Sequence, residues 1–251
     1  MEKITSRSNG LLVHMKKLAV SAAYRREQGI YLCDSPKLLA EALKWHAPVR
    51  EIAVTADVPL PPLPETVRAV EIPEDVMSSI SPMKSPQGAL FTVTLPETAV
   101  PEALPGSRYM VLDGVQDPGN VGTILRTLDA FDFDGLLLLE GCADPWSVKT
   151  VRSSMGAVFR RPVWCLKAAQ LPGLLTRSSL PLYGTALRQD TEDVRAVPLD
   201  RCAIVIGSEG QGISDAVLAL CQKTVKIPMS QRCESLNAAI AATVLLWESY
   251  R

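Results

Sequence analysis

The sequence has little histidine and no cysteine pairs at metal-binding spacing. Only His14 and His46 occur among 251 residues, far apart and without acidic or cysteine neighbours at ligand spacing. The six cysteines are scattered without a C-x-x-C motif, several of them in apolar segments where a thiol packs as a small hydrophobic side chain. We therefore expect free thiols, no metal site and no histidine general base.

Long hydrophobic runs are also missing. The longest, such as residues 135–139, are far shorter than the roughly 20 residues that a membrane span requires. The start at Met1 lacks the apolar region of a signal peptide. With 47% hydrophobic and 21% charged residues, the composition is that of a globular protein. We expect a cytoplasmic protein with no membrane partner.

An excess of positive charge is lacking as well, since the net charge is −1. This excludes a protein that binds nucleic acid through bulk charge alone. Basic residues nevertheless gather in residues 1–28, with six against two acidic residues, and in residues 149–161, with four and no acidic residue. Such segments are either solvated helix faces or phosphate contacts, and the sequence leaves both open.

Two domains are predicted from the alternation of helical and strand patterns. Residues 1–95 contain a helical apolar stripe from Ser8 to Gln28 and strand-like runs at 30–33, 51–55, 67–72 and 89–94. Three prolines and a glycine without hydrophobic periodicity mark residues 96–108 as a linker. The second domain is then 109–251.

The sequence pattern of the second domain predicts a parallel sheet with helices on both faces. Continuous apolar strands are expected at 109–112, 135–139, 182–186, 202–206 and 225–227, and a helix at 119–131. A final helix over 234–250 is apolar on nearly all sides. It must be buried by its own domain or by a second subunit, and we favour a homodimer.

Polar residues follow three of these strands. Asn120 and Arg126 lie on the helix that opens at 117–120 (DPGN), at the carboxyl edge where open α/β sheets bind ligands. Both side chains are candidates to face this crevice, and a surface charge is the alternative for Arg126.

A glycine-rich loop, residues 207–212 (GSEGQG), follows another apolar strand. It matches neither a P-loop nor G-x-G-x-x-G, so it is not a phosphate cradle of those kinds. Its glycines permit close backbone approach to a ligand or a tight turn, and Glu209 adds an acid. The third segment runs from Ile227 and Met229 to 234–237 (ESLN), where Ser235 either caps the helix or binds a ligand.

Taken together, the motifs N-x-G-x-x-x-R-T, I-G-S-E-G-x-G and I-P-M-x-x-x-x-E-S-L-N resemble those of the SpoU (TrmH-like) family of RNA ribose 2′-O-methyltransferases, in the SPOUT superfamily. The resemblance covers about residues 109–251 and includes 154–157, which is similar to the S-x-G-A segment of the family. Residues 1–95 resemble the family's L30e-like substrate-binding module, through the opening helix and residues 85–88 (SPQG).

The resemblance implies a mostly parallel α/β domain with a deep trefoil knot, which is a rare exception to unknotted connectivity. It implies S-adenosylmethionine as cofactor, a homodimer, and an RNA substrate, ribosomal RNA first and transfer RNA second. The cofactor contacts carried over, largely through backbone groups, are Thr185, Gly207, Ile227, Met229 and Leu236.

For catalysis, the resemblance assigns the central role to Arg126. Asn120 and Glu209 would hold it in place, and Ser235 and Asn237 would orient the arginine or the nucleotide. A guanidinium with a pKa above about 12 is a poor general base, so Arg126 is expected to orient and polarise the hydroxyl. A non-catalytic RNA-binding or ribosome-assembly factor is the alternative, and a dehydrogenase is disfavoured by the missing dinucleotide fingerprint.

Overall fold

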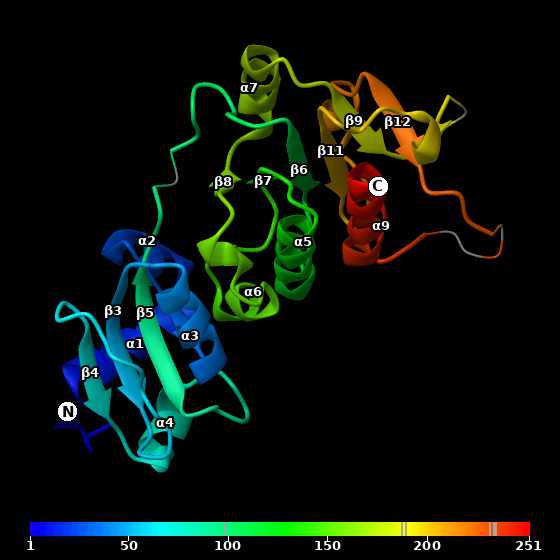
Figure 1. Ribbon diagram of the computed structural model, residues 1–251. Helices are drawn as coiled ribbons and strands as arrows, with labels where there is room; N and C mark the ends of the chain where they lie inside the picture. The colour runs from blue at the N-terminus through cyan, green and yellow to red at the C-terminus, as the bar shows by residue number, and fades with distance from the viewer. Residues whose placement is uncertain (98, 187, 189, 231, 233–234) are drawn as a thin grey trace. The chain divides into compact units, whose positions relative to one another are not determined.

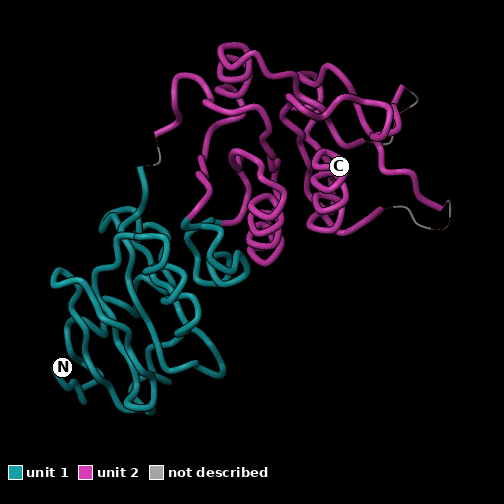
Figure 2. The backbone as a smooth tube through the Cα atoms, in the orientation of Figure 1, with its two compact units in different colours: residues 1–97, 144–159 teal, residues 98–143, 160–251 magenta. Residues whose placement is uncertain are grey.

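The computed structural model describes residues 1–251 except 98, 187, 189, 231, 233 and 234. Glu234 of the third motif therefore lies outside the described residues. The chain divides into two compact units, and each is described by itself (Figure 2). Unit 1 contains residues 1–97 and 144–159, and unit 2 contains residues 98–143 and 160–251. The predicted domain limits, 1–95 and 109–251 with a linker at 96–108, stay predictions.

Unit 1 is built on a five-stranded sheet in the order β1-β4-β3-β5-β2 (Figure 1). The neighbours β1, β4 and β3 pair in parallel, whereas β5 is antiparallel to both β3 and β2. The strands are β1 Glu2–Lys3, β2 Ile30–Asp34, β3 Val49–Val54, β4 Arg68–Glu71 and β5 Ala89–Thr94. The helices are α1 Gly10–Val20, α2 Ala22–Gln28, α3 Pro36–Lys44, α4 Glu74–Ile80 and α6 Val148–Ser153.

The predicted helix from Ser8 to Gln28 is wrong in one respect, because the chain divides it at Ser21. The Ser21 backbone is extended, and its hydroxyl accepts a hydrogen bond from the Tyr24 amide, so it ends α1 and caps α2. A serine at this position competes with the helix by offering its side chain to a backbone N–H. The apolar periodicity continues through the break and therefore conceals it.

Helix α6 and the residues before it belong to unit 1 through ion pairs. Arg25 pairs with Asp144 at 2.5 Å, and Asp34 pairs with Arg152 at 3.1 Å. Asp34 ends β2 and is only 3% exposed. Burial raises the pKa of its carboxyl group, although the nearby Arg152 guanidinium acts in the opposite direction. The predicted assignment of residues 144–159 to the second domain did not anticipate these contacts.

Unit 2 is built on a seven-stranded sheet in the order β10-β12-β9-β11-β6-β7-β8, and all of its strand pairs are parallel. The predicted mostly parallel α/β class is therefore confirmed. The strands are β6 Arg108–Asp113, β7 Gly135–Leu138, β8 Val163–Cys165, β9 Leu182–Thr185, β10 Glu192–Asp193, β11 Cys202–Gly207 and β12 Lys223–Lys226. All residues of β11 are buried, which explains its continuous apolar run.

The helices of unit 2 are α5 Pro118–Ala130, α7 Leu171–Ser178, α8 Asp215–Leu218 and α9 Ala238–Tyr250. Asp117 caps α5 by accepting hydrogen bonds from the Gly119 and Asn120 amides, as the DPGN sequence indicates. Helix α9 begins at Ala238, later than predicted, because Asn237 is its N-cap. It lies beside α5 (Figure 1).

Two sequence-based expectations are tested by the described residues. No helix among them is both long and apolar enough to cross a membrane. The cysteines at 33, 142, 165, 202 and 221 are all free thiols, as predicted, and Cys233 lies outside the described residues.

Candidate active site

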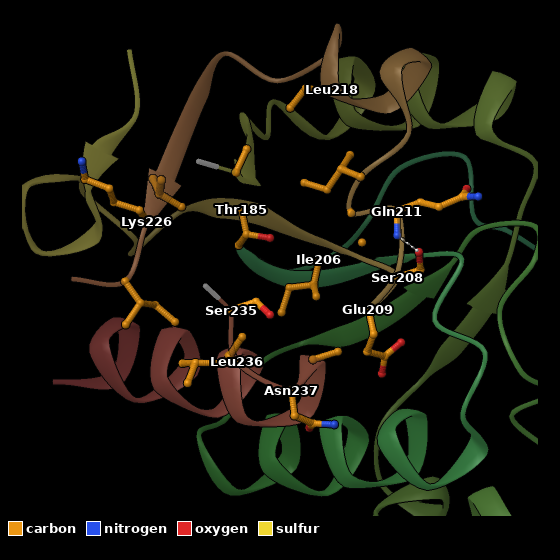
Figure 3. A pocket seen from close by; sticks show the side chains of 18 of the residues that line it. Thr185, Ile206, Ser208, Glu209, Gln211, Leu218, Lys226, Ser235, Leu236 and Asn237 are labelled. Carbon is orange, nitrogen blue, oxygen red and sulfur yellow. Dashed lines mark hydrogen bonds between the residues drawn. The ribbon is translucent and has the colours of Figure 1, made fainter. Parts of the chain in front are cut away.

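A cavity of about 530 Å³ opens at the carboxyl edge of the unit 2 sheet. Its walls come from the ends of β9, β11 and β12, from the glycine-rich loop 207–212, and from the residues that enter α9 (Figure 3). Most of the wall side chains are apolar, among them Ile206, Ile213, Leu218 and Met229. Such a size and an apolar lining with few polar groups are typical of small-molecule sites.

The glycine-rich loop is shaped by a close backbone approach. The amide of Ser208 donates to the carbonyl of Gly212 at 3.0 Å, and the amide of Gly212 donates back at 2.9 Å. A Cβ atom on Gly207 would lie 1.9 Å from the carbonyl carbon of Gly212, so no other residue fits there. Gly212 has a φ of +70°, in the left-handed region. The loop is therefore both a tight turn and one wall of the cavity.

All five residues predicted to contact a cofactor line this cavity: Thr185, Gly207, Ile227, Met229 and Leu236. They come from four separate segments of the chain. The Thr185 hydroxyl donates to the Val205 carbonyl at 3.0 Å, so it supports the adjacent strand. The other four are glycine or apolar residues, so the polar groups at these four positions are those of the backbone.

Three predicted polar residues meet at one side of the cavity. The Asn120 side-chain amide donates a hydrogen bond to the Glu209 carboxylate, and Asn237 Nδ2 donates to Asn120 Oδ1 at 3.3 Å. Glu209 and Asn237 line the cavity, and Figure 3 shows them near one another. Asn237 Oδ1 also accepts from the Ala239 amide at 3.0 Å, which fixes the side chain at the start of α9. The network joins all three sequence motifs.

Arg126 does not line the cavity. It is exposed on α5, and its side chain forms no hydrogen bond or ion pair with any residue that the structure describes. It follows Asn120 by six positions, which on a regular helix turns the two side chains about 120° apart. The interpretation that both look into the same crevice did not allow for this turn. Ser235, in contrast, lines the cavity beside Leu236 and Asn237.

Some lining residues were not predicted. Ser208 and Gln211 belong to the glycine-rich loop, and Lys226 ends β12 immediately before Ile227. Their positions at strand ends were the available signal, because the carboxyl ends of parallel strands share one edge. Asp113 at the end of β6 does not line the cavity, and its carboxylate accepts a hydrogen bond from the Ser214 amide at 2.7 Å.

The two basic segments predicted from the sequence differ in how their charges are paired. In residues 149–161, Arg152 pairs with Asp34, while Arg160 and Arg161 both pair with Asp129. These cations are neutralised within the fold. In residues 1–28, three basic side chains instead pair with no described carboxylate: Lys16, Lys17 and Arg26.

Comparisons with known proteins identify similar chains over the whole length. The profile of the SpoU rRNA Methylase family matches residues 107–247. The 23S rRNA (guanosine(2553)-2′-O)-methyltransferase RlmP of Bacillus subtilis is 31% identical over 248 residues, which cover 98% of each chain.

Solved structures agree with this similarity. A TrmH-family protein from Porphyromonas gingivalis is 34% identical with a TM-score of 0.84, covering 96% of this chain and 97% of that one. The SpoU methyltransferase AviRb from Streptomyces viridochromogenes, in complex with the cofactor AdoMet, is 25% identical with a TM-score of 0.86, with the same two coverages.

Proposed function

The chain belongs to the SpoU rRNA Methylase family, and on this basis we propose that it methylates a ribose 2′-hydroxyl in structured RNA, using S-adenosylmethionine. Ribosomal RNA is the proposed substrate, because the full-length relative RlmP is named for 23S rRNA. Transfer RNA is the second choice. The observation that carries the proposal is the meeting of all three motifs around one cavity, through the contacts of Asn120 with Glu209 and Asn237.

The residues of the cavity fit the cofactor. Apolar side chains such as Ile206 and Leu236 suit an adenine ring and the carbon chain of the methionine part, and the backbone near Gly207 and Ile227 offers polar groups. When bound, S-adenosylmethionine supplies a methyl group on a positively charged sulfur. Thr185, Gly207, Ile227, Met229 and Leu236 would hold it.

The polar network would define the side from which the ribose approaches. Glu209 is held by the Asn120 amide, and Asn237 is held by the first amides of α9, so neither side chain must be reorganised when substrate binds. Ser235 lines the same wall, and the proposal assigns it a contact with the incoming nucleotide. This arrangement positions a hydroxyl group, and it leaves the final proton acceptor to the RNA or to solvent.

Arg126 retains the proposed catalytic role, but it must act from outside the cavity. Its guanidinium is solvent-exposed and has no described partner, so it can bind an RNA phosphate without breaking an existing ion pair. Arginine binds phosphate through two parallel hydrogen bonds, which would fix the neighbouring ribose. We propose that the arginine and phosphate together orient and polarise the 2′-hydroxyl.

The position of Arg126 also supports a second candidate, a non-catalytic RNA-binding factor. The two candidates differ in methyl transfer. With tritiated S-adenosylmethionine and an unmodified 23S rRNA transcript, the wild type is expected to label the RNA, and Arg126→Ala to lose at least about 100-fold of the rate. Arg177→Ala, which alters an exposed arginine on α7, is the control. Cofactor and RNA binding without label transfer would favour the non-catalytic factor.

We also propose a homodimer that covers α9. Three large apolar side chains of this helix are exposed, Ile240 at 54%, Trp247 at 51% and Tyr250 at 55%. Phe131 contacts the last two, each at a centroid distance of 5.7 Å. An apolar surface of this kind favours association. A monomer in sedimentation equilibrium at micromolar concentration would refute this assembly.

Further features of the family remain proposals for this chain. These are the trefoil knot, RNA binding by residues 1–95 as an L30e-like module, and a cytoplasmic location. The knot is supported by the parallel sheet of unit 2, because the knotted fold of the family has a mostly parallel sheet. The three unpaired basic side chains of residues 1–28 support RNA binding by unit 1.

A further inference from the structure

We propose that unit 1 carries a binding site for one phosphate group of the RNA backbone, at the break between α1 and α2. The α1–α2 site consists of His14, Lys17 and Tyr24. Lys17 and the Nε2 atom of His14 would contact the phosphate, and Tyr24 would position both side chains. The inference rests on the proposed function, because it assigns a contact to the RNA that the enzyme methylates.

The break at Ser21 brings Tyr24 back to His14. On one continuous helix these two residues would be separated by about 15 Å along the axis, because each residue rises by about 1.5 Å. In the structure, the Tyr24 hydroxyl and His14 Nδ1 form a hydrogen bond of 2.8 Å, and the two rings meet edge to face at a centroid distance of 5.4 Å. The break therefore builds a contact that an unbroken helix cannot make.

The surroundings of Tyr24 hold this contact in place. The Tyr24 ring packs against the core of unit 1, and the Ser21 hydroxyl caps α2 by accepting from the Tyr24 amide at 3.1 Å. The next residue, Arg25, is only 4% exposed, and its guanidinium donates to the Asp144 carboxylate. Helix α2 is thus anchored beside α1, so the position of the His14 ring does not depend on bound RNA.

The outer nitrogen of His14 is available for a ligand. Nε2 forms no hydrogen bond with any described residue, and it is not a buried atom, so it can reach solvent. A neutral imidazole carries one N–H group, and when Nδ1 accepts from the Tyr24 hydroxyl, the hydrogen lies on Nε2. This is the role that we assign to the tyrosine. His14 then offers an N–H donor to a phosphate oxygen.

Lys17 adds a positive charge beside this donor. It follows His14 by three positions on α1, which puts both side chains on one face of the helix. Its Nζ atom lies 5.6 Å from the centroid of the Tyr24 ring, within the range of a cation–π contact. Lys17 is exposed and pairs with no carboxylate that the structure describes. The ring thus orients the ammonium group without neutralising its charge.

The charge balance of residues 1–28 favours a polyanion at this site. The segment has two acidic residues, and one of them, Glu2, already pairs with Arg68 at 2.8 Å. The other, Glu27, is exposed and forms no ion pair with a described cation. A lysine that binds an RNA phosphate gains affinity through the release of condensed counterions. Because such contacts go to the backbone, the site would position the RNA without reading its bases.

The chain has only two histidines, which allows a direct spectroscopic test on the full-length protein. Proton–nitrogen correlations of isotope-labelled histidine are recorded with and without hexauridylate, and His14→Ala assigns the signals. We expect the hydrogen of His14 on Nε2, and a shift of this Nε2 signal when hexauridylate is added. His46, which is exposed after α3, is the internal control and should not shift.

Four results of this experiment would overturn the site. These are a hydrogen on Nδ1 of His14 in the free protein, no shift of either histidine, an equal shift of both, and a larger shift of His14 with hexaglutamate than with hexauridylate. The last result would assign the surface to an acidic protein segment instead of RNA.

Two lysine variants distinguish a phosphate site from bulk charge. Filter binding to an unmodified 23S rRNA transcript is measured at several salt concentrations. Lys17→Ala is expected to weaken binding about fivefold and to lower the salt slope by about one. Lys44→Ala is the matched control, because Lys44 is an exposed lysine of the same unit that also lies over an aromatic ring, and it should weaken binding less than about twofold. Equal losses in the two variants would refute the site.

Tyr24→Phe tests the positioning role, because it keeps the ring and removes only the hydroxyl group. We expect about threefold weaker binding to the transcript, an unchanged salt slope, and hydrogen on both nitrogens of the His14 population. Since the tyrosine acts through His14, the double variant with His14→Ala should bind no more weakly than His14→Ala alone. Additive losses, or wild-type affinity in His14→Ala, would contradict this role.

The α1–α2 site and the enzymatic function fail separately. If the wild type transfers no methyl group to the transcript while hexauridylate shifts His14 and Lys17→Ala loses RNA affinity, the proposed activity is wrong and the site stands. If methylation proceeds with equal KM for the transcript in the wild type and Lys17→Ala, the site is wrong and the methyltransferase function stands.

Discussion

Two carboxylates at strand ends, Asp34 in unit 1 and Glu209 in unit 2, have opposite surroundings. Asp34 is 3% exposed and pairs with Arg152, and one of its oxygens has no hydrogen-bond partner among the described residues. Glu209 is exposed, bonds to the neutral amide of Asn120, and faces a cavity. The first carboxylate holds a helix in place, whereas the second keeps an acceptor available for a ligand. An acid at or just after the end of a strand is therefore not sufficient to indicate a site.

The largest expected effect comes from the loop that carries Glu209. Gly207→Ala would place a methyl group 1.9 Å from the backbone of Gly212, so the loop must move and the cavity must change shape. We expect loss of at least about 100-fold in methyl transfer and in S-adenosylmethionine affinity, measured by tritium transfer and calorimetry. Gly210→Ala is the matched control, because a Cβ atom there meets nothing within 4 Å. Equal activity in both variants would contradict the role of the loop.

Opposite outcomes are expected when the two acids are replaced. Asp34→Ala should lower the free energy of unfolding by about 2 kcal/mol, since it removes one partner of a buried ion pair whose arginine can still reach water. Its activity per folded molecule should be unchanged. Glu209→Ala should lower kcat about tenfold or more without a change in thermal stability. Denaturant unfolding and steady-state kinetics check both, and a reversal of the two effects would refute the contrast between the acids.

A smaller effect is expected in the pH dependence of stability. Burial raises the folded-state pKa of Asp34 above its ordinary value near 3.8, so folding favours the protonated carboxyl group. The contribution of Asp34 to stability is therefore greatest below that value, and it declines as pH rises through the raised pKa. Asp34→Asn should lack this acidic transition. Unfolding curves between about pH 3 and pH 7 would detect it, and parallel pH profiles would disprove it.

The smallest effect concerns reactivity of the thiols in unit 2. Burial raises the pKa of Cys142 and Cys221 to about 11 and that of Cys202 to about 12, so their thiolate fractions are negligible near neutral pH. Cys165 is exposed. Mass spectrometry after brief alkylation at about pH 8 should find Cys165 modified before these three. Faster labelling of Cys202 would contradict its burial.

The sequence predicted the features that depend on residues close together in the chain. Apolar runs predicted β6, β7, β9 and β11, because both faces of a parallel sheet are covered. Strand β12 was predicted at 225–227, but it spans Lys223–Lys226 and has a lysine at each end. The short strands β8 and β10 were not predicted, because they contain only Val163–Cys165 and Glu192–Asp193 and show no periodic pattern. The cap of α5 at residues 117–120 (DPGN) could be predicted, because a helix cap involves only neighbouring residues.

Contacts between residues far apart in the sequence were harder to predict. Residues 89 positions apart form the Asn120–Glu209 bond, and only the resemblance of the motifs brought them together before the structure did. The pairing of Asp34 with Arg152 spans 118 positions, and nothing in the local pattern indicated that residues 144–159 would pack with unit 1. Helical geometry alone would have separated Arg126 from Asn120, because six residues are not a whole number of turns.

The proposed role of the unit 2 cavity is to direct methyl transfer to a ribose hydroxyl of RNA. Its most direct test is nucleoside mass spectrometry of an unmodified 23S rRNA transcript after incubation with S-adenosylmethionine and either the wild type or Gly207→Ala. We expect a 2′-O-methylated nucleoside with the wild type and none with the variant. A methyl group found on a base, or no methylated nucleoside with a cofactor-binding wild type, would contradict this role.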